Sequence, residues 1–277
     1  MDGFFLLLKA VLFGILEGVT EWLPISSTGH IILLDTLLPL TASEAFYDLF
    51  EILIQLGAIL AVGVLFFHKL NPFSSKKSLP QRKQTVSLWG RVLLATVPSG
   101  VIGLLLDEKL DAFLRSTPLG ATNLNTLVVA AALILYGAAF LLVEKTAPHR
   151  CAPITPKTAL AVGLFQCLSL IPGTSRSGAT ILGALLLGVS RQEAAEFSFF
   201  LAIPTMLGAG FLKLLTFWGT PVTPTEVLAL LLGSLTAFFV SVLTIRKLMD
   251  YVRNHSFALF GIYRILLGGA VLIYFLL

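Results

Sequence analysis

The stretch from Glu17 to His30 concentrates residue types that do chemistry: two carboxylates, three hydroxyls and an imidazole, between apolar runs over 4–16 and 31–38. Glu17 and Glu21 are four residues apart and would share one face of a helix. Each ionised side chain costs about 2.5–3.5 kcal/mol at the centre of a membrane helix, so we interpret the pair as functional rather than as glutamates bonded to backbone. Two such carboxylates suit a hard cation, Mg²⁺ or Ca²⁺, and one of them could instead act as a general base.

Three consecutive hydroxyl residues follow Pro24, which is expected to end the first helix: Ser26, Ser27 and Thr28. Serine and threonine favour the start of a helix, where they cap free backbone N–H groups, and the same N–H groups suit a phosphate. His30 lies three residues after Ser27, so both would face one cavity if a helix begins there. A histidine can activate a serine as a nucleophile or protonate a leaving group; a purely structural cap and histidine are the alternatives.

A second polar segment, Gly173 to Gly178, interrupts another apolar stretch. Its sequence is Gly-Thr-Ser-Arg-Ser-Gly, and Arg176 is the only cation between Ala159 and Val189. A guanidinium binds phosphate oxygens with two parallel hydrogen bonds. We predict an anion clamp at Arg176, with the hydroxyls of Thr174, Ser175 and Ser177 as further ligands; an ion pair of Arg176 with one of the glutamates is the alternative.

The composition indicates an all-α, polytopic membrane protein forming one domain over 1–277. The 277 residues are 56% hydrophobic and 12% charged, with a mean hydropathy of +0.92, whereas soluble domains carry about 25% charged residues. Short apolar runs around the two polar segments predict two re-entrant helical hairpins. Full-length runs predict six transmembrane helices, over 49–67, 92–106, 121–143, 197–218, 227–245 and 256–276.

Charge bias orients these elements. Most Lys and Arg residues fall in the predicted loops 68–91, 144–158, 190–196 and 246–255, which the positive-inside rule places in the cytoplasm. Both termini and the opening of the site are then expected to face outward, away from the cytoplasm. Two further cations in apolar runs, Lys213 and Arg264, are expected to extend to the membrane interface, and the two cysteines are not expected to form a disulfide.

The two hairpins resemble each other, because Gly14 to Gly29 aligns with Gly163 to Gly178 with one slip. Each hairpin is followed by three spans, so the chain divides into repeats of about 1–143 and 155–277 with opposite orientation. Interrupted helices at matching positions of an inverted repeat point to a site at the membrane midplane. Chance similarity is the alternative to this repeat.

Together these motifs resemble those of the bacterial undecaprenyl-diphosphate phosphatases of the bacitracin-resistance type. The resemblance rests on Glu-Gly-x-Thr-Glu-x-Leu-Pro-x-Ser-Ser-Thr-Gly-His, on Pro-Gly-x-Ser-Arg-Ser-Gly-Ala-Thr, and on the segments that begin at Glu51 and Gly188. It implies release of one phosphate from undecaprenyl diphosphate, which recycles the lipid carrier for peptidoglycan synthesis, with a divalent cation. The family's functional positions match Glu17, Glu21, Ser27, His30 and Arg176.

The resulting hypothesis is a membrane phosphatase whose partners are a polyprenyl diphosphate and membrane lipids, without nucleic acid. Ser27 is the first candidate for the nucleophile; water activated by the metal and His30 itself are the alternatives. Inverted repeats are also a transporter architecture, so a flippase for polyprenyl phosphates is the second function class, and a serine–histidine protease is a weaker third. Glycine- and alanine-rich spans would allow a homodimer.

Overall fold

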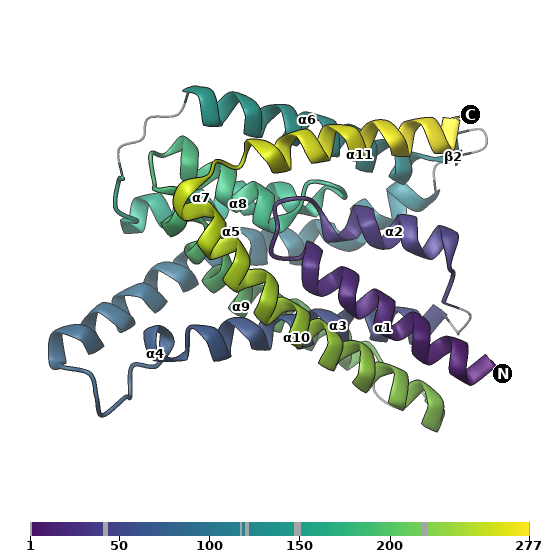
Figure 1. The fold of residues 1–277 in the computed structure, drawn as a ribbon, viewed down its shortest axis with the longest axis horizontal. Coiled ribbons are helices and arrows are strands. Elements are labelled where there is room, and N and C mark those ends of the chain that lie inside the picture. Colours follow the sequence, from purple (N-terminus) through teal and green to yellow (C-terminus); the bar gives the residue numbers. More distant parts are fainter. Residues whose placement is uncertain are drawn as a thin grey trace. The chain divides into compact units, whose positions relative to one another are not determined.

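In the part of the chain that the structure describes, the regular elements are helices, apart from two strands of two residues each. The fold is given by a computed structural model that describes residues 2–40, 44–116, 118–119, 122–146, 151–217 and 221–276 (Figure 1). The elements are α1 (Asp2–Thr20), α2 (Ser27–Leu37), α3 (Glu44–Leu65), α4 (Phe67–Leu70), α5 (Leu79–Ser116), β1 (Pro118–Leu119), β2 (Thr122–Asn123), α6 (Leu124–Thr146), α7 (Pro156–Gln166), the 3₁₀ helix η1 (Cys167–Leu170), α8 (Arg176–Leu186), α9 (Arg191–Thr216), α10 (Pro224–Asn254) and α11 (Ala258–Leu276).

Six helices in the described part of the chain are long and apolar enough to cross a membrane, which confirms the predicted number. One of the six predicted spans is replaced by another helix. The first qualifying segment is Gly3–Thr20, which the sequence assigned to a hairpin, whereas Ala258–Tyr274 in α11 is counted among the shorter apolar helices. The reason is that α1 continues past the apolar run and through Glu17 to Thr20.

Several predicted loops are extensions of helices. The segment 79–91 belongs to α5, which starts at Leu79 and continues to Ser116, and α10 extends to Asn254. Hydropathy marks only the apolar part of a helix, whereas Lys, Arg, Gln and Leu are good helix formers outside it. The basic residues assigned to loops therefore lie partly on helical turns that extend the spans.

The chain forms two compact units, and each takes segments from both predicted repeats. Unit 1 comprises Met1–Trp22, His30–Gly90 and Ala202–Lys247; unit 2 comprises Leu23–Gly29, Arg91–Leu201 and Leu248–Leu277. In unit 1, α1 packs against α10 so closely that a Cβ at Gly14 would overlap the carbonyl oxygen of Gly233. Phe13 and Phe50 meet edge to face beside this contact, with ring centroids 6.1 Å apart.

In unit 2, α6 and α11 lie side by side (Figure 1) through a reciprocal contact of two glycines. A Cβ at Gly137 would lie 2.7 Å from the carbonyl oxygen of Gly261, and one at Gly261 would lie 2.8 Å from that of Gly137. On another side of the unit, a Cβ at Gly163 of α7 would overlap the carbonyl oxygen of Ala95 in α5. Small residues thus allow backbones to approach closely, as is common between membrane helices.

Two helix pairs with a broken centre carry the predicted site segments. The first is α1 and α2, and the Lys9 ammonium donates a 2.5 Å hydrogen bond to the carbonyl of Pro39, so the segment after α2 lies against the middle of α1. The second is α7, η1 and α8, closed at its outer end by a 2.8 Å hydrogen bond from the Ala152 N–H to the carbonyl of Gly188. In each pair the chain runs to a polar break and returns.

Candidate active site

The break in the first helix pair ends in a serine cap. Ser26 has a φ of +75°, and its Oγ accepts a 3.3 Å hydrogen bond from the N–H of Gly29. Ser26 is buried, and Ser27, the first residue of α2, is half-buried. The sequence placed a helix start among these hydroxyls, and the position of α2 confirms it. The side chain of Thr28 lies outside the described residues.

The break in the second helix pair has the same local geometry. Ser175 has a φ of +71°, and its Oγ accepts a 3.1 Å hydrogen bond from the N–H of Gly178. Arg176 is the first residue of α8 and so takes the place that Ser27 has in α2. A positive φ is uncommon for a residue other than glycine and clusters at functional sites. Among the described residues other than glycine, only Cys151 shares it with these two serines.

The carboxylates and the histidine belong to unit 1. Glu17 lies in the last turn of α1 with its side chain fully buried, and Glu21 follows in the turn, half-buried. The N–H of Glu21 donates a 3.0 Å hydrogen bond to the carbonyl of Glu17, so the helical spacing of the pair is kept. His30 is buried in the first turns of α2.

This donor set suits a hard cation only in part. Among the described residues no group of three or more His, Cys, Asp and Glu side chains comes together as a ready metal cage. Two carboxylates are nevertheless what Mg²⁺ commonly takes from a protein, because it completes its shell with water and substrate phosphates. Glu17 is completely buried, which agrees with a carboxylate that binds a ligand rather than one that is solvated at the surface.

Arg176 is anchored to the neighbouring helix. One terminal nitrogen, Nη1, donates a 2.8 Å hydrogen bond to the carbonyl of Ser198 in α9. The hydroxyl of Ser198 lies 2.7 Å from that of Thr180, one turn further along α8. The guanidinium is therefore held in place by α9, as a clamp for a small anion requires.

Two contacts within unit 2 join the breaks of the two helix pairs. The Ser177 hydroxyl donates a 3.2 Å hydrogen bond to the carbonyl of Leu23 and lies 3.1 Å from the Ser175 hydroxyl. Thr174 is fully buried beside them. The structure thus brings the predicted hydroxyls of the second break against the segment that leads into Ser26 and Ser27.

The second joining contact comes from Arg264, which the sequence assigned to the membrane interface. That prediction is wrong, because Arg264 is fully buried. It donates hydrogen bonds to the carbonyls of Pro24 in the first break (3.1 Å) and of Gly173 and Thr174 in the second (2.9 and 3.0 Å). Its acceptors are backbone carbonyls, which leave no signature in a sequence; the one available signal was a lone cation in an apolar run. Lys213, by contrast, is exposed.

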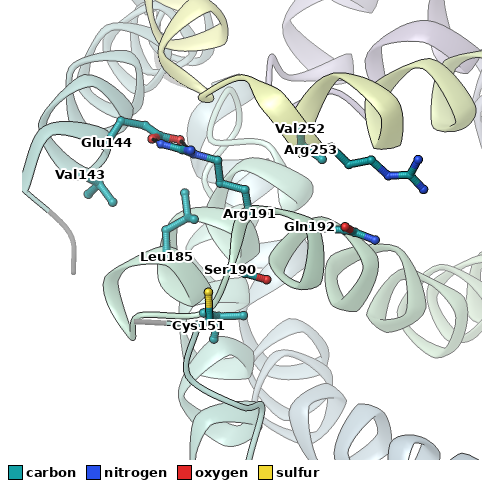
Figure 2. Close-up of a pocket in the computed structure, with 10 residues that line it drawn as sticks. Val143, Glu144, Cys151, Leu185, Ser190, Arg191, Gln192, Val252 and Arg253 are labelled. Atoms are coloured by element: carbon teal, nitrogen blue, oxygen red, sulfur yellow. Dashed lines mark hydrogen bonds and ion pairs between the residues drawn. The ribbon is translucent and has the colours of Figure 1, made fainter. Parts of the chain in front are cut away.

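A separate cavity of about 310 Å³ lies at the outer end of the second helix pair and contains none of the predicted site residues (Figure 2). On its wall Arg191 pairs with Glu144, whose side chain is only 6% exposed. The Glu144 carboxylate also accepts a 2.7 Å hydrogen bond from the N–H of Phe257. This carboxylate joins the end of α6, the start of α9 and the segment before α11, and we interpret it as structural.

Comparison with known proteins agrees with these motifs. Residues 10–270 match the family described as bacitracin resistance protein BacA. The chain is 52% identical over 283 positions to undecaprenyl-diphosphatase 1 of Clostridioides difficile strain 630, with 100% of both chains covered. It is 50% identical over 277 positions to the undecaprenyl-diphosphatase of Enterococcus faecalis strain V583, covering 97% of each chain. The corresponding protein of Limosilactobacillus fermentum is 50% identical over 279 positions, with 98% of each chain covered.

Proposed function

Because the chain belongs to the BacA family, we propose that it is an undecaprenyl-diphosphatase. It hydrolyses undecaprenyl diphosphate to undecaprenyl phosphate and phosphate, recycles the lipid carrier for peptidoglycan synthesis and thereby confers resistance to bacitracin. The observation that carries this proposal is the pair of matched helix starts in unit 2. Ser27 opens α2 and Arg176 opens α8, and direct hydrogen bonds join the two breaks.

The diphosphate binds where these helices begin. Helix starts present free N–H groups and a partial positive charge to an anion. Arg176, held by Ser198, contacts the phosphate oxygens together with the hydroxyls of Ser175 and Ser177. Because charge grows on these oxygens during the reaction, a fixed guanidinium stabilises the transition state more than the bound substrate. Thr174, Ser26 and Thr28 complete the binding residues in this proposal.

Ser27 is the nucleophile of the preferred mechanism. Its oxygen forms a bond to the terminal phosphorus while the bridging oxygen–phosphorus bond breaks, so undecaprenyl phosphate leaves. His30 or Glu21 takes the serine proton, and water then hydrolyses the phosphoserine. Direct attack by water and attack by His30 are the alternatives. Glu17 and Glu21 would hold Mg²⁺ or Ca²⁺, and the bound cation would neutralise charge on the phosphate oxygens.

Two re-entrant hairpins in an inverted repeat complete the proposal, with the site open to the outer face of the inner membrane. The repeats cover about 1–143 and 155–277. The matched caps at Ser26 and Ser175 support this arrangement, and so does the burial of both Glu17 and Gln166, which occupy equivalent positions of the repeat. The reciprocal contact of α6 with α11 supports it too. A homodimer remains an arrangement that glycine-rich helices allow.

Phosphate release from undecaprenyl or farnesyl diphosphate tests the function, using purified protein in detergent with Mg²⁺, with Ca²⁺ or with EDTA. We expect metal-dependent release that Glu21→Ala abolishes. Ser27→Ala is expected to lower kcat by about 1,000-fold or more while lipid binding persists. Ser190→Ala is the matched control, because Ser190 caps α9 beside the separate cavity, and it should keep normal turnover.

Each contrary result of this assay has its own meaning. Near-normal turnover by Ser27→Ala would refute the covalent serine and favour direct attack by water. If EDTA leaves phosphate release unchanged, the proposed requirement for a divalent cation is wrong. If folded wild-type protein binds the lipid but releases no phosphate, the phosphatase assignment fails, and a flippase with the same binding residues takes its place.

A further inference from the structure

Arg264 is a cation buried in the protein interior with backbone carbonyls as its acceptors. Its Nη1 donates to the carbonyl of Pro24 at 3.1 Å, and its Nη2 donates to those of Gly173 and Thr174 at 2.9 and 3.0 Å. A longer contact of 3.5 Å reaches the carbonyl of Ala132 in α6. The guanidinium carbon also lies 5.6 Å from the ring centroid of Tyr136, at cation–π distance.

No carboxylate among the described residues pairs with this charge. The interactions of Arg264 are carbonyl dipoles and one aromatic face, and its Nε finds no acceptor in the described part of the chain. A buried charge without a counter-ion is unfavourable, and an apolar side chain would fill the same space at lower cost. Retaining the guanidinium here therefore points to a use other than packing.

The guanidinium also controls the direction of the backbone in both breaks. A trans peptide directs its N–H opposite to its carbonyl, and the structure has no cis peptide among the described residues. With the carbonyls of Pro24 and Thr174 turned toward Arg264, the N–H groups of Ile25 and Ser175 point away from it. Ser175, which carries the second of these N–H groups, is one of the two serines with a positive φ; the other, Ser26, directly follows Ile25.

The location of the charge suits a negative ligand. Arg264 lies against the first turn of α8, where a Cβ at Gly178 would be only 3.1 Å from Nη1, and it contacts Pro24, shortly before α2 begins. Helix starts carry a partial positive charge, so a cation beside them is unfavourable until an anion binds. A diphosphate is such an anion.

We propose that Arg264 is a positioning residue of the phosphatase centre. It holds the start of α2, with Ser27, and the start of α8, with Arg176, in a fixed mutual position, and its uncompensated charge strengthens diphosphate binding. This inference rests on the proposed function for the identity of the anion. It adds α11, which carries Arg264, to the two breaks before α2 and α8 as a third segment that contributes to the site.

Two conservative variants separate the two parts of this role. Arg264→Lys keeps the charge but cannot reach three carbonyls with a planar fork, so kcat should fall by about 10- to 100-fold, as for small misplacements of reacting groups, with KM changed less than about 3-fold. Arg264→Gln keeps two N–H donors but loses the charge, so KM should rise about 10-fold and kcat should fall as well. Both variants retain donors for the carbonyls, so both should fold.

Inorganic pyrophosphate provides a readout that does not depend on turnover. Its affinity, measured by calorimetry on the purified protein with the metal present, should fall about 10-fold in Arg264→Gln and stay near the wild-type value in Arg264→Lys. Arg191→Met is the matched control. It removes another partly buried arginine of unit 2, paired with Glu144, and should lower thermal stability while the folded protein keeps wild-type kcat, KM and pyrophosphate affinity.

A purely structural Arg264 would give a different pattern. Both variants would then lower thermal stability, as is expected of Arg191→Met, but the folded protein would keep wild-type kcat, KM and pyrophosphate affinity. This result would overturn the proposal. If the wild type itself releases no phosphate, the proposed function fails instead, and the pyrophosphate series still reports on whether Arg264 supports an anion site.

Discussion

The ion pair of Glu144 with Arg191 offers a direct test of what stabilises unit 2. Its carboxylate accepts hydrogen bonds from Arg191 Nε at 3.1 and 3.0 Å and from Nη2 at 2.5 Å, and from the N–H of Phe257 at 2.7 Å. Removing one partner of a fully buried ion pair costs about 3–5 kcal/mol. Because Arg191 is 31% exposed, water screens the pair, and we reduce this term to about 2 kcal/mol.

Glu144→Ala also leaves the N–H of Phe257 without its acceptor, which adds about 1 kcal/mol. The sum of about 3 kcal/mol corresponds to a fall in Tm of about 6–12 °C for a chain of this size. Glu144→Gln keeps an acceptor for Phe257 and should lose only about two thirds as much. Tryptophan fluorescence during heating in detergent, at one fixed scan rate, measures these shifts.

The double variant with Arg191→Met completes the cycle. We expect a coupling free energy of about 1–2 kcal/mol between the two positions, because each side chain stabilises the fold mainly through its ion pair with the other. A Tm of Glu144→Ala within about 2 °C of wild type, or a double variant whose loss equals the sum of the single losses, would refute the reasoning.

Two further predictions concern packing and orientation. Gly163→Ala should lower Tm and the yield of monodisperse protein, because the added methyl group forces α7 away from Ala95 at a cost of about 1–3 kcal/mol. The control Gly90→Ala on α5, where a Cβ meets open space, should be neutral or stabilising by up to about 1 kcal/mol. Equal Tm values for both variants would contradict the close contact. Ser75 is exposed between α4 and α5, so in a chain whose native cysteines are replaced by serine, Ser75→Cys should react with an impermeant maleimide only after the cells are opened; reaction in intact cells would reverse the proposed orientation.

The sequence was most informative where a structural rule is local. The serine cap at the first break follows from residue type next to a helix start, whereas the matching cap at Ser175 came only from the structure. The order of helices follows from apolar runs. Glu144 and Arg264 show where local rules stop. The sequence placed Glu144 in a polar loop, although its carboxylate is nearly buried by contacts to α9 and the segment before α11.

Arg264 was misplaced for a related reason. A cation in an apolar run either extends to the interface or turns inward, and the choice depends on which acceptors surround it in three dimensions. Its acceptors are carbonyls of Pro24, Gly173 and Thr174, freed by breaks in other helices far away in the sequence. Neither hydropathy nor charge counting carries that information.

The contact between Gly137 and Gly261 has a consequence for how such a molecule can arise. Each glycine approaches the carbonyl of the other at nearly the same distance, which is the pattern of an isologous interface between identical subunits. Here both surfaces belong to one polypeptide, so covalent linkage supplies the high effective concentration that separate subunits would need. Under the proposed inverted repeat, this contact would descend from the interface of a self-associating ancestor whose gene was duplicated and fused, and each half would then be free to specialise.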